Sequence, residues 1–405
     1  MKQGYKNSEL GIIPEEWEVK KLGDILKNYS LGGNYENVSG ESDLPLIKMG
    51  NVGRGRMNIS KVEYLAKDVR YSENDILHFN DILFNTRNTL ELVGKVAIWK
   101  NELAFALYNS NLMRMYFKEE FIDNNDFINF QFNSGLSLSN LKRFATGTTS
   151  VAAIYTKDLL KLKIPLPPLA EQKAIADCLA TWDKVIAHQT LLIKAKEERK
   201  KALMQQLLTG KKRLTGFTEE WKMVKLGDLF SERNETKIVD LPLLSIGQDG
   251  VYPQTDSNKR DISNNDKSKY KRIAPGDIGY NTMRMWQGRS ALSSLEGIVS
   301  PAYTILTPKK NVNSYYFSIL FKTTKLTNLF WRNSQGLVDD TLNCKYKDFS
   351  KIKYWVPSFE EQTAIATILN TAEKEIEIEE QKLADVQQQK KGLMQQLLTG
   401  KVRLV

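Results

Sequence analysis

Apolar residues recur at alternating steps of four and three along two stretches of the chain, residues 165–210 and 356–405. This spacing is the heptad pattern of paired α-helices, in which the apolar positions of each helix face its partner. The predicted helix-pairing positions are Ile175, Leu179, Trp182, Ile186, Ile193, Leu203 and Leu207 in the first stretch, and Ile365, Leu369, Ile376, Leu383, Val386, Leu393 and Leu397 in the second. The pattern therefore predicts two long helices that share a seam.

Local signals mark both ends of the predicted helices. Pro167 and Pro168 precede the first helix and suit a helix start, and Glu171 in its first turn favours the helix dipole. Gly210 and Gly400 follow the last apolar residues, as a left-handed helix end requires. At 1.5 Å per residue, each helix is about 60 Å long, which is too long to lie across one small domain.

The chain also repeats itself. Residues 201–211 read Lys-Ala-Leu-Met-Gln-Gln-Leu-Leu-Thr-Gly-Lys, and residues 391–401 differ from them only in Gly392, which replaces Ala202. The match continues backwards in the same register as far as the prolines before each helix. A run of this length in register indicates a duplicated unit.

Polar residues interrupt the seam at Gln189, Lys196, Lys200, Glu379 and Lys390. Buried polar seam positions lower stability but fix register and partner. If the two helices run antiparallel, Glu379 falls near Lys196, which predicts an ion pair between them. The alternative is that each helix packs only on its own domain.

Two globular regions, residues 1–164 and 211–355, precede the two helices. Both regions open with a tryptophan followed by Lys-Leu-Gly-Asp, and we interpret these residues, Trp17 and Trp221, as packing anchors. Short apolar runs broken by Gly, Asn, Asp and Pro predict a twisted sheet with long loops in each region. The predicted fold class is α+β, with two pseudo-symmetric α/β domains separated by two long antiparallel helices that form a coiled coil.

Charge and cysteine content narrow the class of protein. The chain has 58 Lys+Arg against 48 Asp+Glu, a formal net charge of +10, and this surplus suggests a polyanionic partner. Cys178 and Cys344 form neither a disulfide framework nor a metal-ligand spacing. No apolar run reaches membrane-spanning length and the N-terminus has no signal-peptide core, so we expect a cytoplasmic protein.

The segments that differ between the two globular regions hold polar side chains suited to DNA. Arginine suits guanine edges, asparagine and glutamine suit adenine, and small hydroxyls suit phosphates. The candidate DNA-binding residues are Arg54, Arg56, Asn85, Arg87, Asn88, Lys142, Arg143, Thr148 and Thr149 in the first region, and Gln248, Lys259, Arg260, Arg284, Gln287, Arg289, Arg332 and Ser334 in the second. We predict two DNA-contacting clusters, one in each region.

The motifs of catalysis are missing from the chain. It has no Gly-x-x-x-x-Gly-Lys-Ser/Thr phosphate loop, and its two histidines, His78 and His188, lie far apart in sequence. No spacing singles out a pair of carboxylates, and Asp81 and Asp277 are predicted to shape turns. We therefore predict no catalytic residue and no metal ligand in this chain.

The order of these features resembles a known family. A variable domain and a long helix occur twice, with paired Trp…Lys-Leu-Gly-Asp openings, Pro-x-x-x-Glu-Gln helix starts and Leu-Met-Gln-Gln-Leu-Leu-Thr-Gly-Lys helix ends. This arrangement, over essentially the whole chain, is similar to the DNA specificity subunit of type I restriction-modification enzymes. The resemblance implies a target recognition domain in residues 1–164 and another in 211–355, each reading one half of a bipartite, asymmetric DNA sequence.

The resemblance also implies partners. The two helices, 165–210 and 356–405, would act as the spacer and dock two modification (methyltransferase) subunits, which bring S-adenosylmethionine for adenine methylation. Two restriction subunits would add ATP- and Mg-dependent translocation and cleavage, so this chain would bind no cofactor itself. None of the family motifs matches a base-contacting residue, so the DNA-binding candidates rest on residue type alone.

Two other classes of function stay open from the sequence. One is an autonomous nuclease with an unrecognised carboxylate site, and the other is a scaffold whose coiled coil organises partners without DNA. Assay of the purified chain with Mg²⁺ and DNA distinguishes the first, and a salt-dependent shift of duplex DNA argues against the second.

Overall fold

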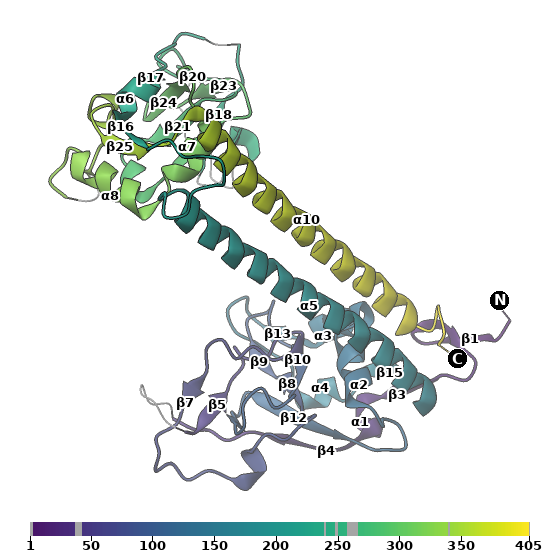
Figure 1. The fold of residues 1–405 in the computed structure, drawn as a ribbon. Coiled ribbons are helices and arrows are strands. Elements are labelled where there is room, and N and C mark those ends of the chain that lie inside the picture. Colours follow the sequence, from purple (N-terminus) through teal and green to yellow (C-terminus); the bar gives the residue numbers. More distant parts are fainter. Residues whose placement is uncertain are drawn as a thin grey trace. The chain divides into compact units, whose positions relative to one another are not determined.

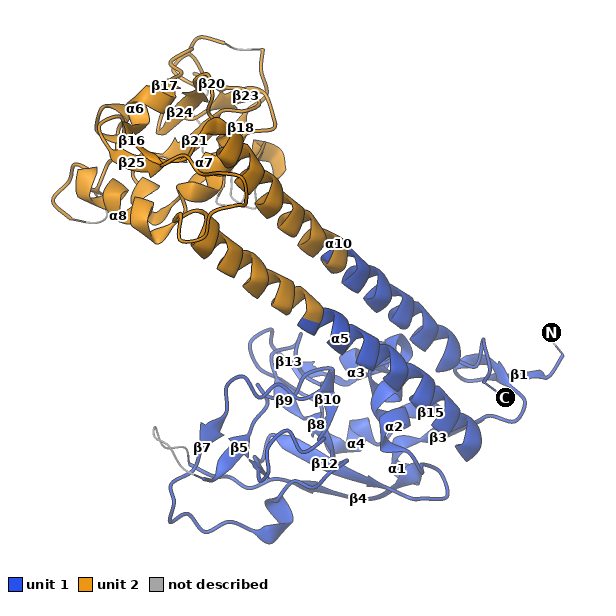
Figure 2. Cartoon of the chain, in the orientation of Figure 1, with its two compact units in different colours: residues 1–191, 380–405 blue, residues 192–379 orange. Residues whose placement is uncertain are grey.

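The computed structural model describes residues 3–36, 43–238, 240–247, 250–256, 266–338 and 341–404. The chain forms two compact units, residues 1–191 with 380–405 and residues 192–379 (Figure 2). Each unit contains one globular region and a part of both long helices. The units therefore cut both helices, whereas the predicted division at residues 164, 210 and 355 follows the sequence repeat and stays a prediction.

A mixed sheet of five strands forms the centre of the first unit (Figure 1). Its order is β4 (Leu26–Leu31), β12 (Leu112–Phe117), β8 (Ile82–Asn85), β10 (Val96–Ile98) and β6 (Gly55–Arg56). Only the β10–β6 pair is parallel among these strands. The residues of β8 and β10 are buried on both faces, because helices and loops cover the sheet on its two sides.

Smaller elements surround this sheet in the first unit. The strands are β1 (Tyr5–Ser8), β2 (Gly11–Pro14), β3 (Glu18–Lys21), β5 (Pro45–Ile47), β7 (Glu63–Tyr64), β9 (Arg87–Asn88), β11 (Leu107–Tyr108), β13 (Thr146–Gly147), β14 (Ala152–Ala153) and β15 (Lys163–Leu166). The helices are α1 (Leu22–Ile25), η1 (Glu73–Asp75), α2 (Asn125–Phe132), α3 (Gly135–Phe144) and α4 (Thr156–Leu159). Asn124 and Ser134 cap the N-termini of α2 and α3 with their side-chain oxygens.

The second unit repeats this plan with four strands in its main sheet. Their order is β17 (Phe230–Glu232), β24 (Tyr303–Pro308), β21 (Ile278–Asn281) and β22 (Ser290–Leu292). The other elements are β16 (Lys222–Lys225), α6 (Leu226–Leu229), β18 (Leu244–Ile246), β19 (Val251–Pro253), η2 (Gln254–Asp256), β20 (Lys271–Ile273), η3 (Met285–Gln287), β23 (Gly297–Val299), α7 (Ser314–Leu320), α8 (Thr324–Asn333), α9 (Tyr346–Phe349) and β25 (Lys353–Val356). The predicted fold class is confirmed: both units are mixed α/β bodies built on one plan.

The long helices are α5 (Leu169–Leu207) and α10 (Phe359–Leu397), 39 residues each. Leu397 of α10 and the following Leu398 pack with Ile175 and Leu179 of α5 in the first unit. In the second unit Leu207 of α5 and the following Leu208 pack with Ile365 and Leu369 of α10 in the same way. All the predicted seam positions are buried or half-buried. The helices also join the domain cores. The alternative that each helix packs only on its own domain is therefore wrong, because the two helices contact each other as well.

Ion pairs between the helices give their direction within each unit. In the second unit Lys196 Nζ lies 2.9 Å from Glu375 Oε2, and Lys200 pairs with Glu373. In the first unit Lys390 Nζ lies 2.5 Å from Asp183 Oδ2. The partner number falls as the α5 number rises, so the helices are antiparallel. The ion pair of Lys196 is with Glu375, one turn before the predicted partner Glu379, and the hydrogen bond from Lys196 lowers the pKa of Glu375.

A buried carboxylate at the start of each long helix joins three parts of its unit. Glu171 in the first turn of α5 accepts a hydrogen bond from the Trp17 indole nitrogen at 2.9 Å. The Arg403 guanidinium, from the segment after α10, binds both Glu171 oxygens at 3.1 and 2.9 Å. The predicted anchoring role of Trp17 is confirmed, because this side chain has no exposed surface.

The second unit contains the same three-residue motif. Glu361 of α10 accepts hydrogen bonds from Trp221 Nε1 at 3.1 Å and from Arg213 Nε and Nη2, both at 2.7 Å. Glu361 is 1% exposed and Glu171 2% exposed. A carboxylate with this burial needs paired hydrogen-bond donors to remain charged. The bidentate contact with Glu361 raises the pKa of Arg213.

Removing either arginine tests the strength of this motif. We expect Arg403→Ala to destabilise the first unit, and Arg213→Ala the second, by about 3 kcal/mol each, because each leaves a buried carboxylate without its ion pair. Urea unfolding of the full chain measures both effects. The double variant Glu171→Gln with Arg403→Ala is expected to recover part of the loss, and single variants as stable as the unchanged chain would contradict the prediction.

The two glycines that follow the helices provide a matched pair. Gly210 and Gly400 have φ of +69° and +71°, which confirms the predicted left-handed helix ends. A Cβ on Gly400 would lie 2.3 Å from Pro14 Cδ, whereas the nearest atom to a Cβ on Gly210 is in Trp221 at 3.4 Å.

We expect Gly210→Ala to cost about 1–2 kcal/mol for the left-handed backbone, and Gly400→Ala to cost about 1–3 kcal/mol more through overlap with Pro14. The control is Gly392→Ala inside α10, where a Cβ meets no atom within 4 Å. This variant reproduces Ala202 of the other copy and is expected to stabilise the helix by up to about 1 kcal/mol. Thermal unfolding measures the order of the three variants, and a different order would contradict the role given to Pro14.

Candidate nucleic-acid interface

In the first unit a small three-stranded sheet gathers most of the candidate residues. Strand β9 pairs with β14, which forms a hairpin with β13. The N–H of Ile154 donates to the Thr86 carbonyl at 2.9 Å and fixes the hairpin beside the end of β8. Gly147 has a φ of +132°, and a Cβ at this position would lie 2.3 Å from the Val151 carbonyl oxygen. The turn therefore requires glycine.

Six predicted residues lie on or beside this hairpin, and we call them the first hairpin cluster. They are Arg87 and Asn88 on β9, Thr148 and Thr149 in the turn, and Lys142 and Arg143 in the last turn of α3, just before β13. All except the half-buried Asn88 are exposed. The hairpin thus brings together residues 87–88 and 142–149, which are more than fifty positions apart in the sequence.

The remaining first-region candidates have other surroundings. Arg56 Nη2 lies 2.8 Å from Asp183 Oδ1 of α5, so this guanidinium links β6 to the helix. Arg54 is exposed, and its Nη2 is 3.5 Å from the Glu91 carbonyl. Asn85 has no exposed surface. A side chain with this burial has nothing to offer a base, so we leave Asn85 out of the proposed contact set.

The second unit uses the same frame. Cys344 N–H donates to the Thr282 carbonyl at 2.9 Å, which corresponds to the Ile154–Thr86 bond. Gln335 and Asn343 form an antiparallel bridge, and Gly336, with a φ of +152°, would place a Cβ 2.7 Å from the Thr341 carbonyl oxygen. The two units therefore carry equivalent hairpins. The first lies beside the end of β8 and the second lies beside the end of β21.

Five predicted residues of the second region lie around this frame, and we call them the second hairpin cluster. They are Arg284, Gln287 and Arg289, between β21 and β22, and Arg332 and Ser334 at the end of α8. Helix α8 packs on η3, which brings the two groups together. Gln287, Arg289 and Arg332 are exposed, whereas Ser334 donates its hydroxyl to the Phe330 carbonyl at 2.8 Å. Gln248, Lys259 and Arg260 lie outside the described residues.

Apolar residues at the hairpin turns were not among the sequence candidates. Val151 is 62% exposed in the first unit, and Leu337 and Val338 are 101% and 61% exposed in the second. Residue type gives them no hydrogen-bonding role, so a search for polar base contacts passes over them. The signal that marks each turn in the sequence is a glycine, Gly147 in the first region and Gly336 in the second.

The two carboxylates that the sequence predicts to shape turns, Asp81 and Asp277, both have structural partners. Asp81 Oδ2 accepts the His78 N–H at 2.8 Å and an Arg114 guanidinium bond at 2.9 Å. Asp277 Oδ2 accepts the Ala274 N–H at 2.9 Å and the Arg233 Nε at 2.7 Å. The prediction that Asp81 and Asp277 shape turns is confirmed.

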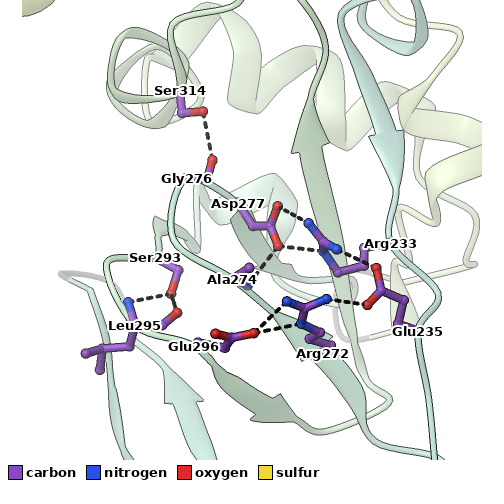
Figure 3. Close-up of polar contacts among 10 residues, drawn as sticks. All are labelled: Arg233, Glu235, Arg272, Ala274, Gly276, Asp277, Ser293, Leu295, Glu296 and Ser314. Atoms are coloured by element: carbon purple, nitrogen blue, oxygen red, sulfur yellow. Dashed lines mark hydrogen bonds and ion pairs between the residues drawn. The ribbon is translucent and has the colours of Figure 1, made fainter. Parts of the chain in front are cut away.

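Figure 3 shows the extended network around Asp277. Arg233 binds Asp277 and Glu235, and Arg272 binds Glu235 at 2.7 Å and Glu296 at 2.6 Å. Hydrogen bonds from Arg272 and then Arg233 lower the pKa of Glu235. Arginines and carboxylates alternate in this network, so each carboxylate in it already has an arginine partner. The network holds β20 and β23 against the main sheet.

Among the described residues, no group of three or more His, Cys, Asp or Glu side chains is arranged to hold a metal ion. Within the same residues no helix is both long and apolar enough to cross a membrane. The burial of Cys344 raises its pKa to about 12, so this thiol stays protonated near neutral pH.

Two long segments of the chain, residues 14–197 and 218–388, match the family described as type I restriction modification DNA specificity domain. The chain belongs to this family. The matched segments include both hairpin clusters, both Trp–Glu pairs and most of the two long helices. The family match therefore includes both copies of the repeated domain-and-helix unit.

Relatives extend the match along the whole chain. The chain is 27% identical over 438 residues to a putative type I restriction enzyme MjaX specificity subunit of Methanocaldococcus jannaschii, covering 99% of this chain and 97% of that protein.

Two solved structures share the fold of this specificity-family chain. The HsdS subunit from Thermoanaerobacter tengcongensis has a TM-score of 0.50 at 16% identity, over 96% of this chain and 98% of that chain. The type I restriction-modification S subunit from M. genitalium has a TM-score of 0.53 at 15% identity, over 94% and 96%. Similarity at this level of identity concerns the fold alone.

Proposed function

We propose that this chain is the sequence-reading subunit of a type I restriction-modification complex and has no catalytic site of its own. Each recognition domain, residues 1–164 and 211–355, reads one half of a bipartite, asymmetric DNA site. The observation that carries this proposal is the equivalent hairpin in both units, held by the same backbone bond but bearing different exposed side chains. A constant frame with variable side chains suits two readers of unlike half-sites.

The two hairpin clusters supply the chemistry for reading DNA. Exposed arginines match the paired acceptors of guanine in the major groove, and Asn88 and Gln287 match adenine. Lys142, Arg143, Thr148 and Thr149 suit phosphates, which position the protein on the duplex. The net charge of +10 adds a sequence-independent, salt-dependent attraction.

The helices, residues 165–210 and 356–405, set the spacer between the half-sites and dock two modification subunits. Apolar side chains outside the seam support the docking role: Val185 and Leu191 are 44% and 64% exposed in the first unit, and Leu192 and Ile378 are 42% and 55% exposed in the second. Three of these residues lie on α5 and Ile378 lies on α10, so both helices offer apolar surface to docked subunits. Those subunits bring S-adenosylmethionine, and two restriction subunits bring the ATP- and Mg-dependent steps.

Substitutions in one cluster are expected to relax one half-site only. Arg87→Ala in the first unit and Arg289→Ala in the second each remove about 1–3 kcal/mol of discrimination at a base pair. Methylation-site mapping by single-molecule sequencing, in cells carrying the complete modification complex, measures this effect. The control is Arg70→Ala, an exposed arginine outside the cluster. Relaxation of both half-sites by either variant would contradict independent reading.

Lengthening the helices is expected to lengthen the spacer and leave both half-sites unchanged. One extra heptad in each of α5 and α10 preserves the seam and adds about 10 Å, which corresponds to roughly three base pairs at 3.4 Å each. The same mapping reads the result. Altered half-sites with an unchanged spacer would contradict the assignment of the helices as the spacer.

A nuclease or a DNA-free scaffold makes different predictions for the purified chain. We expect neither cleavage nor methylation of duplex DNA in the presence of Mg²⁺, together with binding that weakens steeply with salt. Cleavage by the purified chain would favour the nuclease, and absence of any binding, alone and in the complex, would favour the scaffold.

A further inference from the structure

Trp17, Glu171 and Arg403 in the first unit, and Trp221, Glu361 and Arg213 in the second, form what we call the Trp–Glu–Arg motif. The two units differ at the surface beside this motif. In the first unit the β1–β2 hairpin lies against the end of α10 (Figure 1). Tyr5 Oη donates to the Gly400 carbonyl at 3.1 Å, Pro14 occupies the space next to Gly400, and Glu9 forms an ion pair with Lys163 of β15. The hairpin thus covers the surface formed by Gly400, Trp17 and Lys163.

The covering hairpin belongs to the core of the first unit. Ile13 of β2 is 2% exposed and packs in the same apolar cluster as Trp17, Leu166 and Leu397. The segment bound at this surface therefore contains an aliphatic residue followed by proline, Ile13 and Pro14. A carboxylate four positions before the aliphatic residue, Glu9, pairs with Lys163.

The second unit has no such hairpin within its described residues. Between the end of α5 at Leu207 and the start of β16 at Lys222 the chain forms no strand. Gly210, Trp221 and Lys353, which correspond to Gly400, Trp17 and Lys163, instead line a cavity of about 570 Å³. The three atoms nearest to a Cβ on Gly210 all belong to Trp221, at 3.4 to 3.5 Å, so no side chain among the described residues approaches this glycine as closely as Pro14 approaches Gly400.

Apolar and charged side chains both line this cavity. Met223 and Trp355 are cross-strand partners on β16 and β25 and are 46% and 54% exposed. Leu329 and Tyr354 complete the apolar surface. Lys325, Lys353 and Glu220 also line the cavity and are exposed, and neither lysine has an ion-pair partner in the part of the chain that the structure describes. The site therefore combines apolar area with two exposed lysines that form no ion pair with Glu220 or with another described carboxylate.

We propose that this cavity is the docking site for an arm of a partner protein, a strand or hairpin that carries an aliphatic–proline pair and a nearby carboxylate. The first unit shows the type of contact, because an equivalent surface binds such a segment from this chain itself. The lysine pair supplies the complementary charge for the carboxylate, as Lys163 does for Glu9. The two units consequently present different faces to their protein partners, one covered and one open. The proposal does not depend on DNA reading by either hairpin cluster.

A peptide that copies residues 3–14 is the probe for this site. An isolated hairpin is marginally stable in water, so the peptide is cyclised, labelled with a fluorophore and titrated against the full chain by anisotropy. We expect saturable binding at one site per chain. Lys353→Glu is expected to weaken binding by about tenfold, since it replaces an attraction to the peptide carboxylate by a repulsion. A peptide with Glu9→Lys is expected to recover binding to the Lys353→Glu chain.

Matched controls distinguish binding at this cavity from binding elsewhere on the chain. Lys351→Glu changes an exposed lysine of the same unit outside the cavity lining and is expected to leave binding unchanged. If the peptide instead displaced the native β1–β2 hairpin in the first unit, its affinity would be the same for the unchanged chain and for the Lys353→Glu chain. Absence of binding, equal binding to the Lys353→Glu chain, or displacement of the peptide by duplex DNA would each overturn the proposal.

Crosslinking in the complete complex tests the natural occupant. A photoreactive residue at position 223 is expected to crosslink to a segment of a partner subunit that contains proline and a carboxylate. Crosslinks confined to this chain would overturn the proposal. Both assays read protein contacts only, so loss of DNA binding in the variants of the hairpin clusters leaves their outcome unaffected.

Discussion

A buried glutamate at the start of each long helix links the three parts of its unit. Glu171 and Glu361 each accept a hydrogen bond from a tryptophan indole and a bidentate contact from an arginine. The tryptophan comes from the opening of the globular region, and the arginine comes from the segment that follows the other helix. Because a buried carboxylate is costly without its donors, the opening segment, the helix start and the far helix end must assemble together. Each unit is therefore closed by the same set of contacts between its opening segment, one helix start and the other helix end.

The same closure constrains the helices. An arginine after α10 reaches the start of α5, and an arginine after α5 reaches the start of α10, only if the helices run antiparallel. The polar seam residues then meet opposite charges, as in Asp183–Lys390 and Glu373–Lys200. Pairs of this kind add little net stability but penalise other registers. The proposed spacer role requires such a fixed register.

On this constant frame the surface differs between the two units. The backbone bonds Ile154–Thr86 and Cys344–Thr282 hold equivalent hairpins, yet one turn carries hydroxyls and the other exposes Leu337 and Val338. The surface beside the Trp–Glu–Arg motif is covered by β1 and β2 in the first unit and open in the second. Duplication thus preserved the contacts that close each unit, while the surfaces available to partners diverged.

The sequence by itself determined the duplication, the two helices, their left-handed glycine ends and the anchoring tryptophans, because heptad spacing and helix-end chemistry are local and the repeat shows them twice. The turn roles of Asp81 and Asp277 were equally local. Only the tertiary structure decided which candidates come together: it gathered Arg87 with Thr148, paired Arg56 with Asp183 and buried Asn85. It also matched Lys196 with Glu375 and showed that Arg403 and Arg213 hold the buried glutamates. These contacts join residues far apart in the chain, so no local pattern encodes them, and burial depends on how whole elements pack.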